Sequence, residues 1–202
     1  MEYYHDLITQ KSWQELQLMQ KELDFILLGG WAIYFYTKKL KSKDIDILVN
    51  YDQLPLIEKK YRFYKNDRLH KYEAVKDEVQ IDIYLPHYSQ LGIPGEILFQ
   101  QFTRISGFKL LEINYLFVLK IYTLVERGRS SKGRKDFLDL ISLYLSDQID
   151  FDKIKKIIKQ YLCKDKNEVF QQFLNEATDI PELNLNTHYY AKIKKEIMEN
   201  LY

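Results

Sequence analysis

The residues best suited to chemistry in this sequence are three aspartates at polar positions of two predicted strands. Asp44 and Asp46 lie two residues apart in a segment that alternates polar and apolar residues, and Asp82 lies between Ile81 and Ile83. On a strand, residues two apart share one face. Carboxylates held this close repel each other unless a cation separates them, and hard divalent cations prefer oxygen ligands. We therefore expect all three to bind Mg²⁺ or Mn²⁺; the alternative is polar residues that face water.

A glycine pair precedes these acids and suggests a phosphate-binding turn. Gly29 and Gly30 lie between an apolar segment at 24–28, which predicts a strand, and a segment at 31–40 with helical periodicity. Glycines here would let the backbone approach a ligand closely, and the start of the next helix offers unpaired N–H groups to phosphate oxygens. An ordinary tight turn is the alternative. Together with the acids, the pair indicates a site for a triphosphate.

The elements that must position these residues form a mixed α/β half followed by a helical half. Strands are predicted at 24–28, 44–49, 69–75, 78–85 and 107–113, with a tight turn at 76–77, and helices at 4–21, 31–40, 54–61, 116–127, 135–145, 151–162, 168–177 and 189–201. The predicted fold class is α+β. A small mixed or antiparallel sheet with helices occupies residues 1–113, and a helical region occupies residues 114–202.

The motifs follow one another in a specific order. Leu28-Gly29-Gly30-Trp31 is followed, after a predicted helix, by Ser42-Lys43-Asp44-Ile45-Asp46, and later by Ile81-Asp82-Ile83. This order resembles the polymerase β-like nucleotidyltransferase superfamily. The resemblance implies a nucleotidyltransferase core over residues 1–113. It also implies that Asp44, Asp46 and Asp82 are metal ligands and catalytic residues, and that Gly29, Gly30, Trp31 and Ser42 bind the nucleotide. Trp31 departs from the family pattern, in which a small hydroxyl residue often follows the glycines.

The helical half contains a second motif. Lys120 lies in an apolar segment and is followed by a basic stretch at 127–134 and by Lys135-Asp136-Phe137-Leu138-Asp139. Two aspartates three apart share a helix face and could hold Lys120 in place, while Lys120 could neutralise the β and γ phosphates. The motif resembles the AbiEii-like branch of the superfamily, whose members include toxins of toxin–antitoxin and phage-abortive systems. This resemblance makes Lys120 catalytic and nucleotide-binding, and adds Arg134, Lys135, Asp136 and Asp139 to the nucleotide-binding residues. Surface charge pairs are the alternative.

Composition limits the classes of partner. The 202 residues include 30 Lys and Arg against 29 Asp and Glu, a formal net charge of +1, so any contact with nucleic acid must be local. No apolar run approaches the ~20 residues needed to span a bilayer, and the first ten residues lack the order of a secretory signal. A cytoplasmic protein without membrane contact is therefore expected. The single cysteine, Cys163, excludes an internal disulfide.

The predicted activity is transfer of a nucleoside monophosphate from a nucleoside triphosphate, such as ATP, to an acceptor hydroxyl, with release of pyrophosphate. The AbiEii-like resemblance implies an RNA or tRNA 3′ end as acceptor, a toxin role, and a cognate antitoxin or other partner protein. A protein hydroxyl, as in the minimal nucleotidyltransferase antitoxins, or a small molecule stays open as acceptor. The alternative of a different class is a nucleotide-binding module without catalysis.

Overall fold

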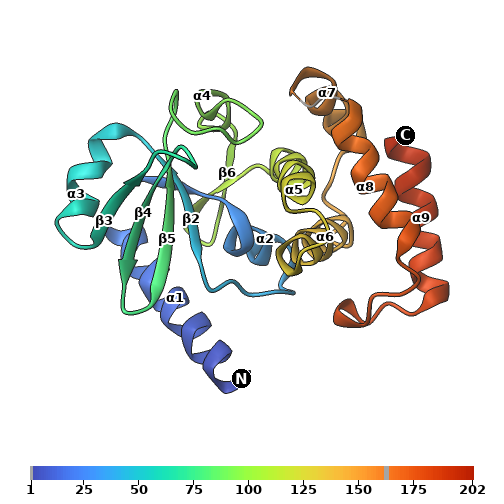
Figure 1. The fold of residues 1–202 in the computed structure, drawn as a ribbon, viewed down its shortest axis with the longest axis horizontal. Coiled ribbons are helices and arrows are strands. Elements are labelled where there is room, and N and C mark those ends of the chain that lie inside the picture. Colours follow the sequence, from blue (N-terminus) through green and yellow to red (C-terminus); the bar gives the residue numbers. More distant parts are fainter. Residues whose placement is uncertain (1, 162–163) are drawn as a thin grey trace. The chain divides into compact units, whose positions relative to one another are not determined.

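The computed structural model describes residues 2–161 and 164–202 (Figure 1). The chain divides into two compact units, Met1–Glu112 and Ile113–Tyr202. The end of the helix predicted at 151–162 and Cys163 lie outside the described residues. In the part of the chain that is described, no helix is long and apolar enough to cross a membrane.

The first unit is a mixed sheet with helices. Its elements are α1 (Glu2–Glu22), β1 (Phe25–Leu27), α2 (Gly29–Thr37), β2 (Ile45–Val49), a 3₁₀ turn (Tyr51–Gln53), α3 (Leu54–Glu58), β3 (Arg62–Asn66), β4 (Lys71–Lys76), β5 (Val79–Tyr84), α4 (Gly95–Leu98), β6 (Phe102–Ile105) and β7 (Phe108–Leu111). Within the described residues the strand order is β3-β4-β5-β2-β1-β7-β6, so β3 and β6 form the edges. β2 runs parallel to β5 and antiparallel to β1, and this mixed sheet confirms the predicted fold class.

The two faces of the sheet differ in chemistry. Ile45, Ile47, Ile81 and Ile83 are fully buried, and alternation places them on one face. Helix α1 packs on this face, where Lys76 of β4 bonds to Glu15 and the ring of Phe108 in β7 lies near Trp13. The opposite face receives the residues in between, among them Asp46 and Asp82. Burial of one face therefore fixes where the acids point.

Several element boundaries differ from the sequence-based prediction. The tight turn predicted at 76–77 is wrong by one residue, because Lys76 pairs with Val79 and the turn residues are Asp77 and Glu78. Both have positive φ, 47° and 72°, as a two-residue hairpin turn of type I′ requires. β3 and β6 were not predicted, since neither segment, Arg62–Asn66 or Phe102–Ile105, has the buried residues of a core strand.

The second unit is helical throughout its described part. It contains α5 (Ile113–Arg127), α6 (Ser131–Tyr144), α7 (Phe151–Tyr161), α8 (Lys164–Glu176), a 3₁₀ turn (Pro181–Leu183) and α9 (Thr187–Leu201). The buried rings of Phe117, Phe137 and Phe170 join α5, α6 and α8. Helix α6 begins at Ser131 and not at Lys135 as predicted, so Arg134 lies in the helix and not in the basic stretch before it. Its N-terminus is capped by the Ser130 hydroxyl, which accepts a hydrogen bond from the Gly133 N–H.

Candidate functional site

The first part of the site is a close approach between Gly29 and Asp46. Gly29 has φ +58° and is the first residue of α2. A Cβ at this position would lie 1.9 Å from Oδ2 of Asp46, which no side chain can tolerate. The Leu28 N–H donates to the Asp46 carbonyl oxygen over 2.8 Å, which fixes the end of β1 against β2. Glycine is therefore required here, both for its backbone conformation and for the room it leaves to the carboxylate.

The start of α2 offers donors at the same place. Leu28 occupies the N-cap position and, as far as the described residues show, no side chain caps this helix end. The first N–H groups of a helix have no intrahelical acceptor and carry a partial positive charge. Phosphate oxygens satisfy such groups well. The Gly29–Asp46 junction thus combines a phosphate-binding helix start with a carboxylate.

The second part of the site is a row of carboxylates across three neighbouring strands. Asp46 of β2 lies directly opposite Asp82 of β5, and Asp82 lies directly opposite Glu73 of β4. Residues paired in this way point to the same face, with Cβ atoms about 5 Å apart. Asp44 precedes β2 and is exposed. The structure therefore brings Asp46 and Asp82 together and adds Glu73, which sequence reasoning missed.

Lys71 neutralises part of this row. Its Nζ lies 2.6 Å from Oδ2 of Asp82 and 3.1 Å from Oε1 of Glu73, and its side chain is only 9% exposed. Burial alone would lower the pKa of Lys71, but its hydrogen bonds and charge interactions with Asp82 and Glu73 outweigh that effect and raise it. Lys71 is therefore a buried ammonium. Sequence reasoning missed it because a single lysine at the start of a strand usually faces water.

In the first unit, the side chains of Trp31 and Ser42, both predicted to bind the nucleotide, are buried. Trp31 is 1% exposed, its ring centroid lies 5.2 Å from that of Trp13 with the rings tilted by 41°, and its indole N–H donates to the Ser12 hydroxyl over 2.8 Å. Its side chain thus anchors α2 to α1, which leaves only its backbone to face a nucleotide. Ser42 is 4% exposed.

The predicted motif of the second unit forms an ion cluster between α5 and α6. Nζ of Lys120 lies 2.8 Å from Oδ1 of Asp136 and 2.8 Å from Oδ2 of Asp139, and both carboxylates are almost fully buried. Burial alone would lower the pKa of Lys120, but Asp139 and Asp136 outweigh it and hold the pKa above its ordinary value. Arg127 adds a second cation, with Nη1 2.9 Å from Oδ2 of Asp136. The two aspartates hold Lys120 in place, as their spacing predicts.

The remaining residues of the motif, Arg134 and Lys135, lie in the first turns of α6, before Asp136. Arg134 forms a two-pronged pair with Glu182, with three N–O distances of 3.0 to 3.1 Å, and this pair lowers the pKa of Glu182. Lys135 is partly exposed.

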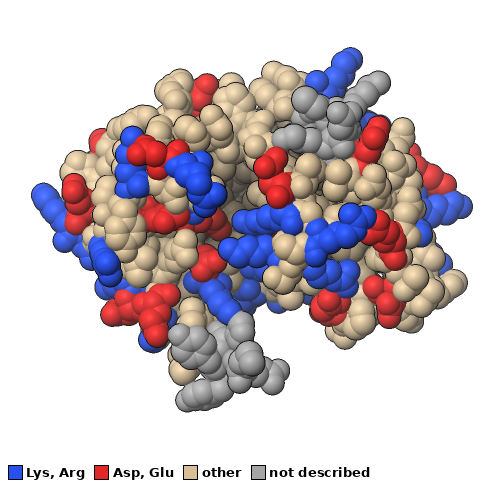
Figure 2. All heavy atoms as spheres, viewed as in Figure 1, with Lys and Arg blue, Asp and Glu red and all other residues tan. Residues whose placement is uncertain are grey.

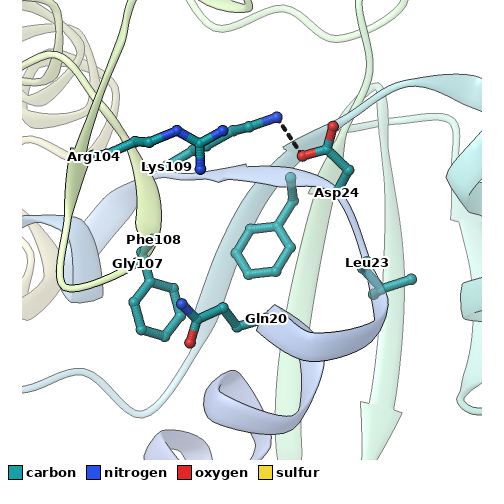
Figure 3. A pocket seen from close by; sticks show the side chains of 8 residues that line it. Gln20, Leu23, Asp24, Arg104, Gly107, Phe108 and Lys109 are labelled. Atoms are coloured by element: carbon teal, nitrogen blue, oxygen red, sulfur yellow. Dashed lines mark hydrogen bonds and ion pairs between the residues drawn. The ribbon is translucent and has the colours of Figure 1, made fainter.

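A small pocket of the first unit lies away from the acids (Figure 3). Arg104, Lys109 and Asp24 line it, and Lys109 forms an ion pair with Asp24. It lies at the beginning of β1, whereas Gly29 follows the end of that strand. Its volume of about 90 Å³ is well below the roughly 300–1,000 Å³ of typical ligand sites. We assign the pocket no part in nucleotide binding.

The row of acids fits a hard divalent cation by the chemistry of its donors. Its donors are carboxylate oxygens, as Mg²⁺ prefers, and the room beside Gly29 is kept free for the Asp46 carboxylate. The Lys71 ammonium already shows that Asp82 and Glu73 hold a cation. The fit is one of donor chemistry and not of a finished arrangement: with Lys71 between Asp82 and Glu73, no group of three or more His, Cys, Asp or Glu side chains among the described residues is arranged to hold a metal ion.

Comparison with known proteins identifies the fold. No protein-family model matches the sequence, and no curated protein matches it. A candidate nucleotidyltransferase from H. pylori matches with a TM-score of 0.53 at 14% identity, over 96% of this chain and 95% of that one. The antibiotic-resistance factor ANT(2'')-Ia matches with 0.51 at 14% identity, over 88% and 100%. JHP933 from Helicobacter pylori matches with 0.50 at 14% identity, over 96% and 93%. The chain therefore has a nucleotidyltransferase-like fold.

Proposed function

We propose that this protein is a metal-dependent nucleotidyltransferase, which moves a nucleoside monophosphate from a nucleoside triphosphate to an acceptor hydroxyl. The observation that carries the proposal is the Gly29–Asp46 junction. There a helix start suited to phosphate lies against a carboxylate suited to a divalent cation, and Asp82 lies one strand away. The nucleotidyltransferase-like fold supports the same activity.

In the proposed reaction, the start of α2 and the three aspartates have different roles. The N–H groups at the start of α2 bind phosphate oxygens of the nucleotide. Asp44 and Asp46 would hold Mg²⁺ or Mn²⁺, which neutralises phosphate charge and lowers the pKa of the acceptor hydroxyl. Asp82, which lies opposite Asp46 on the neighbouring strand, is the carboxylate that would take the proton of that hydroxyl. The acceptor oxygen bonds to the α-phosphorus, the bond from the α-phosphorus to the bridging oxygen breaks, and pyrophosphate leaves.

The acceptor we propose to test first is an RNA 3′ end such as that of tRNA. The resemblance of Lys120 and of Lys135-Asp136-Phe137-Leu138-Asp139 to the AbiEii-like motif supports it, together with a toxin role and a cognate antitoxin. The roles of Lys120, Arg134, Lys135, Asp136 and Asp139 in nucleotide binding rest on that motif. Lys135→Ala is the variant that probes it most cleanly, because Lys120 and Arg134 also form ion pairs within their own unit.

The proposal is tested with each of the four α-labelled nucleoside triphosphates, Mg²⁺ and total RNA. Wild type should transfer label, and Asp44→Ala/Asp46→Ala should lose at least about a hundredfold in rate, since even residues that only orient metal ligands contribute 10–100-fold. Asp52→Ala/Glu58→Ala is the matched control, because it removes two exposed carboxylates of the same unit. Label in RNA supports the RNA acceptor, and label in protein supports the protein acceptor. Transfer that survives the loss of Asp44 and Asp46 would contradict the proposal.

A further inference from the structure

The positive charge beside Asp82 comes from the protein itself, from the side chain of Lys71. Both carboxylate oxygens of Asp82 are engaged: Oδ2 by the Lys71 ammonium at 2.6 Å and Oδ1 by the Gln80 amide at 3.1 Å. Glu73 is held through one oxygen, Oε1, by Lys71 at 3.1 Å and by the Asn66 amide at 2.9 Å. Asp82 thus enters the proposed site already paired with a buried positive charge.

The register of the sheet explains why that charge is needed. Asp46, Asp82 and Glu73 occupy directly opposed positions on β2, β5 and β4. Like charges in opposed positions destabilise a sheet, and a cation between them removes the penalty. Lys71 lies two residues before Glu73 on the same strand, so alternation places it on the acid face. The Lys71 ammonium therefore forms ion pairs with two of the three carboxylates, those of Asp82 and Glu73.

We propose that Lys71 is a built-in counter-cation of Asp82 that a divalent ion must displace before it can bind this carboxylate. The inference rests on the proposed function, because it concerns the same row of acids. Without displacement, the protein takes up one divalent ion at Asp46, and Asp82 stays with Lys71. Occupation of Asp82 by a second ion requires the Lys71 side chain to leave, which makes Lys71 a positioning residue that sets the number of ions bound.

The experiment counts bound Mn²⁺ in the purified full chain, by the loss of the free-ion signal in electron paramagnetic resonance. Lys71→Gln removes the competing charge, so it should bind an additional Mn²⁺ or bind Mn²⁺ at least about tenfold more tightly, the lower end of what a metal-site neighbour contributes. Lys71→Arg keeps the charge and should behave as wild type. Lys65→Gln is the matched control, since it removes an exposed lysine of the neighbouring strand. Asp82→Asn added to Lys71→Gln should abolish the gain.

Each outcome decides one question. If Lys71→Gln leaves Mn²⁺ binding unchanged, or if the gain in Mn²⁺ binding persists when Asp82→Asn is added, the proposed role of Lys71 is overturned and the proposed metal site is not affected. Failure of wild type and Lys71→Gln alike to bind Mn²⁺ through Asp46 would overturn the proposed metal site. If Lys71→Gln does not fold, Mn²⁺ binding is compared instead between two other single variants, Asp46→Asn and Asp82→Asn. Asp46→Asn should then weaken Mn²⁺ binding about tenfold or more and Asp82→Asn much less, whereas equal losses would overturn the inference.

Discussion

At the scale of single residues, the Gly29–Asp46 contact makes a sharp prediction. Gly29→Ala adds a Cβ 1.9 Å from Oδ2 of Asp46 at φ +58°. The backbone conformation alone costs about 1–2 kcal/mol for a residue with a Cβ, and the clash adds to it. Urea unfolding should therefore show a larger loss of stability for Gly29→Ala than for Gly107→Ala. Gly107 has φ +85°, but there the added Cβ meets only the movable end of the Gln20 side chain.

A second variant separates the two costs of Gly29→Ala. In an Asp46→Gly background the carboxylate is gone, so adding Gly29→Ala should cost only the backbone term. If Gly29→Ala lowers the free energy of unfolding equally with and without the Asp46 side chain, the effects of the two substitutions are additive, and the two residues are not energetically coupled.

At this scale, the sequence predicts which face of the sheet two of the candidate site residues occupy, but not their neighbours. Alternation alone puts Asp46 and Asp82 on the face opposite Ile45, Ile47, Ile81 and Ile83, and the structure has them there. The neighbour of Asp82 could not be predicted, because it depends on the turn. A turn at 76–77 would place Lys71 opposite Asp82; the observed turn at 77–78 places Glu73 there. A shift of one residue in a hairpin turn moves the pairing by two residues.

At the scale of elements, the junction of α5 and α6 depends on Lys120. Removing one partner of a buried ion pair leaves an uncompensated charge and typically costs 3–5 kcal/mol. Lys120→Met leaves Asp136 with only Arg127, and it leaves Asp139 without its ion pair. We therefore expect about this loss in the free energy of unfolding, measured by urea denaturation.

Arg127→Met is the control for Lys120→Met. Arg127 pairs with the same Asp136, but its side chain is 43% exposed, so its loss should cost about 1 kcal/mol or less. Similar losses for the two variants would contradict a stabilising role specific to Lys120.

The elements themselves were predicted unequally. Long helices such as α5 and α9 repeat their apolar residues over three or more turns, so their existence could be predicted, with boundaries off by a few residues. β3 and β6 could not, because an edge strand with mostly exposed side chains lacks the alternating burial that marks a strand. The start of α2 at Gly29 itself was also missed, since glycine is a poor helix residue.

At the scale of the molecule, the candidate metal ligands all belong to one unit. Residues 1–112 contain their own sheet and core, Gly29, and the three aspartates. Produced alone, this unit should unfold cooperatively, as domains of this size usually do, and should bind Mn²⁺ in a way that Asp46→Asn weakens. Loss of Mn²⁺ binding in a folded 1–112 fragment would show that the helical unit supplies a ligand.

The protein has almost no net charge, +1 in total, and this bears on how it would bind RNA. Figure 2 shows both basic and acidic side chains on the face in view, and the sequence has nearly equal numbers of them, 30 and 29. Binding of RNA should therefore depend on a local site and fall only moderately with salt, because the slope reflects the few phosphates neutralised.

The two edge strands bear on how the protein behaves at high concentration. A free strand edge can pair with another chain, and charged side chains on the edge discourage this. Here both edges are basic, with Arg62 and Lys65 on β3 and Arg104 on β6. Arg62 also lies over the exposed ring of Tyr64, and Arg104 over that of Phe102. Edge-to-edge association of two copies would bring like charges together, which protects an otherwise open sheet against self-association.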